Sequence, residues 1–231
     1  PLENQQPWIV HGLEDENIKK PIKTQNVRYD KEFQLEGITC AACHVRDGVI
    51  EGPYEDSMAP HPTRYSPRFR STDICYTCHQ VPSGPFQFYN GGPCSTFPEF
   101  TEGPYAKQGY ICQTCHMPEV VRPVAVGGPV REGRRHLWRG GHDPDMIKRA
   151  VSVEVVANPP EFKFGERVTF NLMFKNSGAG HKIPTGDPDR YFTISFTVRD
   201  PQGKVVSTQS HTIGRWILWK PVILELYDNR I

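Results

Sequence analysis

Three copies of the pattern Cys-x-x-Cys-His constrain this chain more than any other feature of its sequence. The copies begin at Cys40, Cys75 and Cys112 and recur at similar intervals. If each motif forms a single helical turn, its first, fourth and fifth residues lie on one face. Each copy then presents two thiols and one imidazole on the same side of the turn.

Two thiols at this spacing can add to the two vinyl groups of one haem, and the histidine that follows can bind the iron. We therefore predict three covalently attached c-type haems. The predicted thioether cysteines and proximal histidines are Cys40, Cys43 and His44; Cys75, Cys78 and His79; and Cys112, Cys115 and His116. We also expect the second ring nitrogen of each proximal histidine to donate to a backbone carbonyl, which fixes the ring.

Other uses of these cysteines explain the sequence less well. A structural zinc ion needs four ligands, usually from two cysteine pairs, and three isolated motifs do not combine in that way. A thioredoxin-like redox pair needs a βαβ context that the flanking residues do not provide. Disulfides would leave the three adjacent histidines unexplained. The seventh cysteine, Cys94, is expected to be a free thiol, with an intermolecular disulfide as the alternative.

Each iron also needs a ligand on its other side. The chain has nine histidines, and with six left for three positions, bis-histidine ligation and low-spin iron are favoured over methionine ligation. We rank His61, between two prolines, and His181, in a glycine-rich loop suited to lean on a cofactor, above His136 and His142. His11 and His211 are expected to have ordinary roles. Four candidates for three irons leave one histidine that could bind a haem of a neighbouring subunit.

The composition suits a chain that wraps cofactors. Only 37% of the residues are hydrophobic, while 20 glycines and 22 prolines are present, so haems would serve as core material. Residues 1–149 are predicted to be an irregular, haem-packed region with short helices. Ser71 is expected to cap the helix of the second motif, and Asp143 with Pro144 to start a helix that runs through Arg149.

From residue 150 the pattern changes to alternation of apolar and polar residues. It is clearest around Val151–Val155, Val168–Phe174 and Phe192–Val198, with further strands expected near residues 205–206, 213–219 and 222–226. We predict a small antiparallel β-sandwich, Ig-like in type, over residues 150–231. About five strands are fewer than the roughly seven of a usual sandwich, which suggests a β-edge shared between subunits.

Several stretches together carry a resemblance to a known family. They are residues 36–48, 60–62, 112–118, 135–144 and 178–186. They resemble the multihaem c-type cytochromes with a C-terminal β-sandwich, a group related to the subunits of extracellular cytochrome filaments. The resemblance implies an exported protein, periplasmic or extracellular, whose haems are attached outside the cytoplasm. It also implies redox partner proteins or extracellular acceptors, and polymerisation through stacked haems. Cys94 and the short β-region depart from the family pattern.

Charge and hydropathy exclude other classes. The net charge is +1, from 27 basic and 26 acidic residues, which does not favour binding to nucleic acids or membrane surfaces. The sequence contains no apolar run long enough to span a bilayer, and any signal peptide is expected to have been removed. Asp187 and Asp189 are expected to form a turn rather than a Ca²⁺ site. Electron transfer is the leading hypothesis. The alternatives are a multihaem oxidoreductase of the nitrite or hydroxylamine type, with one open haem, and a docking role for the β-region.

Overall fold

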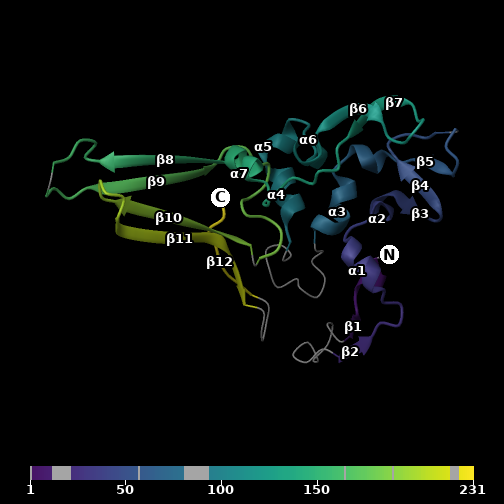
Figure 1. Ribbon diagram of the computed structural model, residues 1–231, viewed down its shortest axis with the longest axis horizontal. Coiled ribbons are helices and arrows are strands. Elements are labelled where there is room, and N and C mark those ends of the chain that lie inside the picture. The colour runs from purple at the N-terminus through teal and green to yellow at the C-terminus, as the bar shows by residue number, and fades with distance from the viewer. Residues whose placement is uncertain are drawn as a thin grey trace. The chain divides into compact units, whose positions relative to one another are not determined.

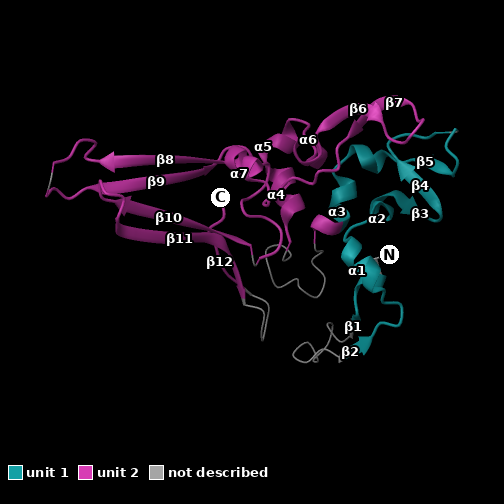
Figure 2. Cartoon of the chain, viewed as in Figure 1, with its two compact units in different colours: residues 1–77, 220–222 teal, residues 78–219, 223–231 magenta. Residues whose placement is uncertain are grey.

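The fold is described from a computed structural model. It covers residues 2–11, 22–56, 58–80, 94–163, 165–188, 190–218 and 224–231. The chain forms two compact units, residues 1–77 with 220–222 and residues 78–219 with 223–231 (Figure 2). The boundary between them lies within helix α3 (Asp73–His79). The division into a haem domain, 1–149, and a β-domain, 150–231, stays a prediction.

The first unit consists of short elements around the first motif (Figure 1). These are η1 (Leu2–Gln5), β1 (Trp8–His11), β2 (Ile22–Gln25), α1 (Lys31–Glu36), α2 (Cys40–His44), β3 (Val45–Arg46), β4 (Val49–Gly52), β5 (Thr63–Tyr65) and η3 (Pro67–Arg70). Strands β1 and β2 are antiparallel, and β4 pairs with β3 antiparallel and with β5 in parallel. Helix α1 begins after Asp30, whose carboxylate accepts hydrogen bonds from two backbone amides in the first turn.

Short helices and a hairpin form the first part of the second unit. They are α4 (Thr96–Glu102), α5 (Pro104–Lys107), α6 (Cys112–His116), β6 (Glu119–Pro123), β7 (Val130–Arg134) and α7 (Pro144–Ala150). Helix α7 confirms the predicted start, because the Asp143 carboxylate accepts bonds from the amides of Asp145 and Met146. The helix of the second motif begins at Asp73, two residues after Ser71, whose hydroxyl accepts a bond from the Asp73 amide. The cap position is therefore Thr72, and Ser71, the residue predicted to be the cap, stands one position before it.

Five strands follow, as the alternation predicted. They are β8 (Val151–Asn158), β9 (Thr169–Asn176), β10 (Tyr191–Arg199), β11 (Val205–Leu218) and β12 (Leu224–Asp228). Strands β8 and β9 form one antiparallel sheet, while β10, β11 and β12 form another. The two short strands expected near residues 205 and 213 are parts of the single strand β11. The rings of Phe170 in β9 and Phe196 in β10 lie 5.2 Å apart and connect the two sheets.

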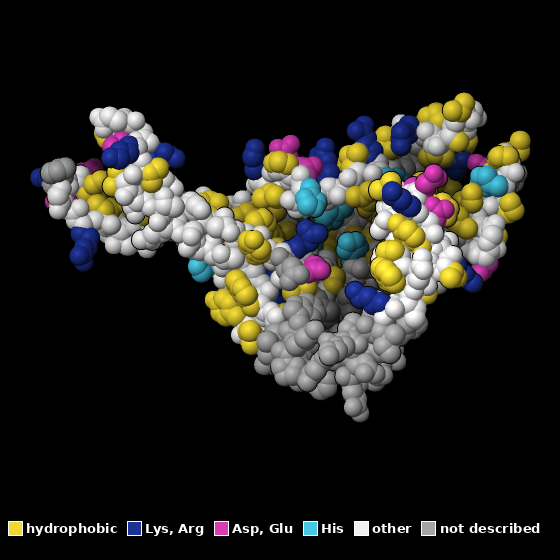
Figure 3. All heavy atoms as spheres, turned by 60° about the horizontal axis from the view of Figure 1, so that its bottom comes forward, with side chains coloured by type: hydrophobic (Ala, Val, Ile, Leu, Met, Phe, Trp, Pro, Cys, Tyr) yellow, Lys and Arg dark blue, Asp and Glu magenta, His cyan; other side chains and the backbone are white. Residues whose placement is uncertain are grey.

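Few of the described apolar side chains are buried, and many large ones are exposed. Among the described residues, the buried apolar side chains are those of Phe100, Met117, Ile183 and Ile213. On the face of β8 that alternation predicted to be buried, Val153 and Val155 are 55% and 52% exposed. Figure 3 shows many hydrophobic side chains and several histidines at the surface. The described fold is therefore a set of small sheets, short helices and irregular segments with a small apolar core. None of the described helices combines the length and apolar composition needed to cross a lipid bilayer.

Candidate cofactor-binding site

Each of the three motifs lies in a short helix, as predicted. Helices α2 and α6 span the first and third motifs, and α3 contains the second. None of their six cysteines is buried or forms a disulfide, and Cys94 forms no disulfide either. The thiols and the imidazole of a motif therefore share one helical turn. Arg134 of β7 supports α6 by donating hydrogen bonds to the carbonyls of Gln113 and Met117 at its end.

Backbone carbonyls orient two of the three proximal histidines. The Nδ1 atom of His44 lies 2.7 Å from the carbonyl oxygen of Glu51, and its ring stacks on Phe69 with centroids 4.5 Å apart. The Nδ1 atom of His116 contacts the carbonyl oxygen of Arg139. With Nδ1 as the donor, Nε2 of each ring keeps its lone pair for a metal ion. The carbonyl partner that the sequence predicted is thus present for His44 and His116.

The carbonyl of Arg139 is held by a constrained stretch of backbone. The preceding residue, Trp138, has a φ of 49°, in a region that costs a bulky residue about 1–3 kcal/mol. Arg139 itself is fixed by its guanidinium, whose Nε lies 3.2 Å from the carboxylate of Asp143, the cap of α7. The turn before α7 therefore directs a carbonyl at the proximal imidazole of the third motif.

The ring of His181 lies parallel to that of His116. Their centroids are 6.2 Å apart and their planes differ by 15°. Two imidazoles that bind one metal ion from opposite sides, at about 2.0 Å each and with about 1.1 Å from nitrogen to ring centre, have centroids about 6.2 Å apart. The Nδ1 atom of His181 lies 2.8 Å from the carbonyl oxygen of Lys182, which again leaves Nε2 available. The donor set and the separation therefore fit a pair of axial ligands.

Glycines bring the loop that carries His181 against neighbouring helices. An added Cβ at Gly178 would lie within 3.0 Å of the backbone of Arg149, near the end of α7. One at Gly180 would lie 2.9 Å from the ring of Phe100 in α4. The amides of Ser177 and Gly178 both donate to the carbonyl of Ala150. The structure thus gives the glycines a packing role against α4 and α7.

We expect Gly178→Ala to lower the free energy of unfolding by about 3 kcal/mol, because a methyl group would overlap the Arg149 carbonyl in a rigid backbone contact. Denaturant unfolding of the purified protein, followed by circular dichroism, measures the effect. Gly133→Ala in β7 is the control, because the nearest atom to its added Cβ is 4.0 Å away. Equal stability of the two variants would contradict the assigned packing role.

The electrostatic environment favours neutral imidazoles. Burial lowers the pKa of His79, and nearby His116 lowers it further. Burial is also the main cause of the lowered pKa of His181; His116 and His79 act in the same direction, against the Lys182 carbonyl and Glu99. The charge of His116 therefore contributes to the lowered pKa of both His79 and His181, and a neutral ring is the form that binds metal ions. At Cys115, burial and the adjacent Cys112 raise the thiol pKa, against the opposing effect of Arg149.

The other histidine candidates are more exposed than His181. His61 lies exposed, with Nδ1 3.5 Å from the carbonyl oxygen of Pro62. His136 is exposed, with Nδ1 3.1 Å from the carbonyl oxygen of Arg134 and its ring at an edge-on contact with Trp138. His142 is exposed beside the cap of α7. Their assignment to irons stays a prediction.

The ordinary roles expected of the remaining candidates stay predictions. His211 is exposed in β11, with Nε2 3.3 Å from the side-chain nitrogen of Asn229. His11 ends β1, and its side chain lies outside the described part of the chain. The thiol of Cys94 lies 3.4 Å from the carbonyl oxygen of His79. Asp189 lies outside the described residues, but the amide of Arg190 donates to the carbonyl of Asp187 at 3.1 Å, which closes a turn of the expected kind.

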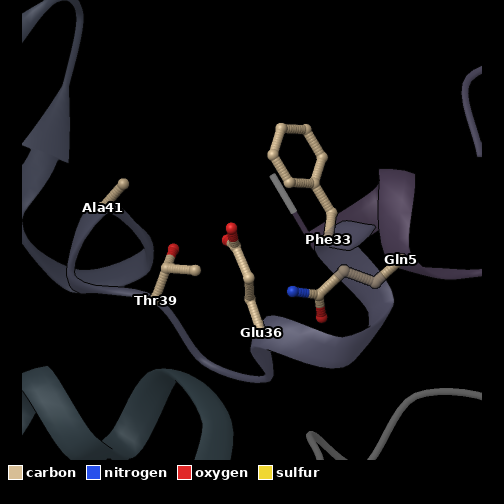
Figure 4. Close-up of a pocket in the computed structure, with 5 residues that line it drawn as sticks. All are labelled: Gln5, Phe33, Glu36, Thr39 and Ala41. Carbon is tan, nitrogen blue, oxygen red and sulfur yellow. The ribbon is translucent and has the colours of Figure 1, made fainter. Parts of the chain in front are cut away.

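A separate hollow lies in the first unit beside α2. Figure 4 shows the side chains around it, which come from η1, α1 and the first turn of α2: Gln5, Phe33, Glu36, Thr39 and Ala41. Its volume is about 300 Å³. None of these five residues is a cysteine or a histidine, so the hollow is not formed by the motif ligands.

The sequence did not indicate which residues hold the His181 loop in place. Asn176 lies five positions from His181, whereas Glu99, Asp228 and Arg230 are far from His181 along the chain. Within the described residues, no three or more histidine, cysteine, aspartate or glutamate side chains form a group able to hold a bare metal ion. Comparisons of the chain with protein-family models, with curated proteins and with solved structures gave no match.

Proposed function

We propose that the chain is an exported c-type cytochrome that transfers electrons through three covalently bound haems, each held by two histidines. The observation that carries the proposal is the third motif. Its two thiols share a helical turn with His116, whose ring lies parallel to His181 at the separation of two axial ligands. A bound haem supplies an iron that gains and loses one electron.

The donor set favours haem over a bare ion. The two imidazoles of His116 and His181 supply only two ligands, whereas a structural zinc ion takes four in a tetrahedron. A porphyrin supplies the four ligands between the two imidazoles, and the motif thiols supply its covalent attachment. The small apolar core supports the same proposal, because a large apolar cofactor would pack against side chains that the protein alone leaves uncovered.

The chain's own residues would then orient the haems and limit access to them. The carbonyls of Glu51 and Arg139 hold the proximal rings, while the loop from Ser177 to Gly186 holds His181. An iron with two imidazoles has no open position for substrate, which favours electron transfer over catalysis. The contact between Phe170 and Phe196 supports the further proposal that β8–β12 form a small Ig-like sandwich.

A count of covalent haems tests the proposal. We expect three haems per purified chain by pyridine haemochrome absorbance, and wholly low-spin iron by electron paramagnetic resonance. Fewer than three haems would overturn the central proposal, and a high-spin signal in the resting protein would favour an oxidoreductase with an open haem. The resemblance allows both a dispersed carrier and a subunit of an extracellular filament. Negative-stain microscopy of native material separates them, since dispersed particles would contradict the filament.

A further inference from the structure

The loop that carries His181 is tied on both sides of this residue to one short segment, Asp228–Ile231. Ile183 and Ile231 exchange two backbone hydrogen bonds, of 2.7 and 3.2 Å. Asn176, at the end of β9, donates from Nδ2 to the carbonyl of His181 at 2.8 Å and to that of Ile231 at 3.4 Å. The backbone around the imidazole is therefore fixed by residues that are distant in sequence.

Charged side chains reinforce the same connection. Lys182 Nζ, next to His181, lies 3.0 Å from Oδ2 of Asp228. Arg230 binds Asp228 with two hydrogen bonds of 2.8 Å each, and its third contact is with Glu99 in α4, also at 2.8 Å. The side chains of Arg230 and Glu99 are 6% and 8% exposed. This ion pair therefore lies out of solvent.

Glu99 of helix α4 contacts both the His181 loop and the segment Asp228–Ile231. One carboxylate oxygen accepts from Arg230 of the segment, and the other accepts from the hydroxyl of Thr185 in the His181 loop at 2.6 Å. The Thr185 hydroxyl also lies 2.9 Å from that of Thr96, the first residue of α4. Helix α4, the loop and the segment are thus joined through one buried carboxylate.

A buried ion pair of this kind contributes little net stability, because desolvation of the two charges offsets their attraction. Removing one partner is costly, since the other charge stays buried and unpaired. Such a pair therefore favours one arrangement of its surroundings over the alternatives. Here the surroundings include the carbonyl of Lys182, which contacts the ring nitrogen of His181.

We propose that Arg230, held between Asp228 and Glu99, is a positioning residue that keeps His181 opposite His116 as the second axial ligand of one haem. The inference rests on the proposed function, because it requires a haem at the third motif. Loss of Arg230 would release the segment from α4 and allow the His181 loop to move. The imidazole could then leave the iron, while the thioether bonds at Cys112 and Cys115 keep the haem attached.

The test uses the haem-loaded protein with Arg230→Met. We expect the reduced wild type to leave carbon monoxide unbound, and the reduced variant to bind about one molecule per chain, with a matching high-spin signal when oxidised. Arg230→Lys should bind an intermediate amount, because lysine keeps the charge but cannot form the paired bonds to Asp228. If Arg230→Met does not fold, Glu99→Gln, which changes the size of the side chain very little, serves instead. It should also give a high-spin signal when oxidised and bind carbon monoxide when reduced.

A matched control separates positioning from general loss of stability. Arg215 in β11 is also buried, at 3% side-chain exposure, and its Nε lies 2.6 Å from Glu225 in β12. We expect Arg215→Met to keep all haems low-spin and unreactive to carbon monoxide. Equal reactivity of Arg215→Met and Arg230→Met would overturn the positioning role. So would three low-spin, unreactive haems in both Arg230→Met and Glu99→Gln. A wild type with fewer than three haems would instead overturn the proposed function.

Discussion

Replacing Cys112 and Cys115 together with serine is expected to remove one of the three proposed haems from each chain. Both sulfurs lie in the single turn of α6, and serine hydroxyls do not form the thioether bonds that attach the porphyrin. The haem absorbance per protein should fall by about a third, and the mass of the intact chain should fall by about one haem. We also expect lower stability, because α6 would lose a packing partner beside Met117, one of the few buried apolar side chains of the described residues.

Cys94→Ser is the matched control for this experiment. Its thiol lies outside the motifs and, like the other six, is not part of a disulfide. This variant should therefore keep all three haems. The corresponding pair in the first motif, Cys40→Ser with Cys43→Ser, lies in the other compact unit and should also cost one haem. Retention of three haems in either double variant, or loss of one from Cys94→Ser, would contradict the assignment of the motifs.

The sequence predicted those parts of the structure that depend on short spacings. Two cysteines and a histidine at fixed spacing gave helical turns at all three motifs. Asp143 and Pro144 marked the start of α7, because capping depends on residues one to three positions away. Alternation marked β8, β9 and β10 for the same reason. Strand β11 was longer than predicted, because polar residues 207–212 interrupt the apolar pattern while still pairing with β10.

The contacts that define the candidate site could not be predicted in the same way. Glu99 and Arg230 are separated by 131 positions, and no local pattern marks one as the partner of the other. The glycines around His181 suggested an approach to a cofactor, but they pack against Arg149 and Phe100, which only the tertiary structure brings near. The ranking of His181 among the candidates came from its loop, whereas its partner, His116, became apparent only from the ring geometry.

The geometry of the His116 and His181 rings leads to a second prediction with a large expected effect. Replacing His181 with alanine is expected to convert one haem from low-spin to high-spin while all three stay covalently attached. His116 would remain on one side of the iron, held by the carbonyl of Arg139, and the opposite side would lose its imidazole. Electron paramagnetic resonance of the oxidised protein should then show a high-spin signal of about one iron in three. The haem count from pyridine haemochrome should stay at the wild-type value.

Two further variants make this result specific. His211→Ala removes an exposed histidine of β11 whose Nε2 lies 3.3 Å from the side-chain nitrogen of Asn229, so every haem should stay low-spin. His181→Met should keep six ligands where the thioether reaches the iron, and it should raise one midpoint potential, because methionine favours the reduced iron more than histidine does. If His181→Ala leaves every iron low-spin, a different residue must supply the ligand opposite His116. The 6.2 Å separation of the two rings would then reflect packing alone, and the exposed His136 and His142, which follow the third motif in sequence, would become the candidates to replace next.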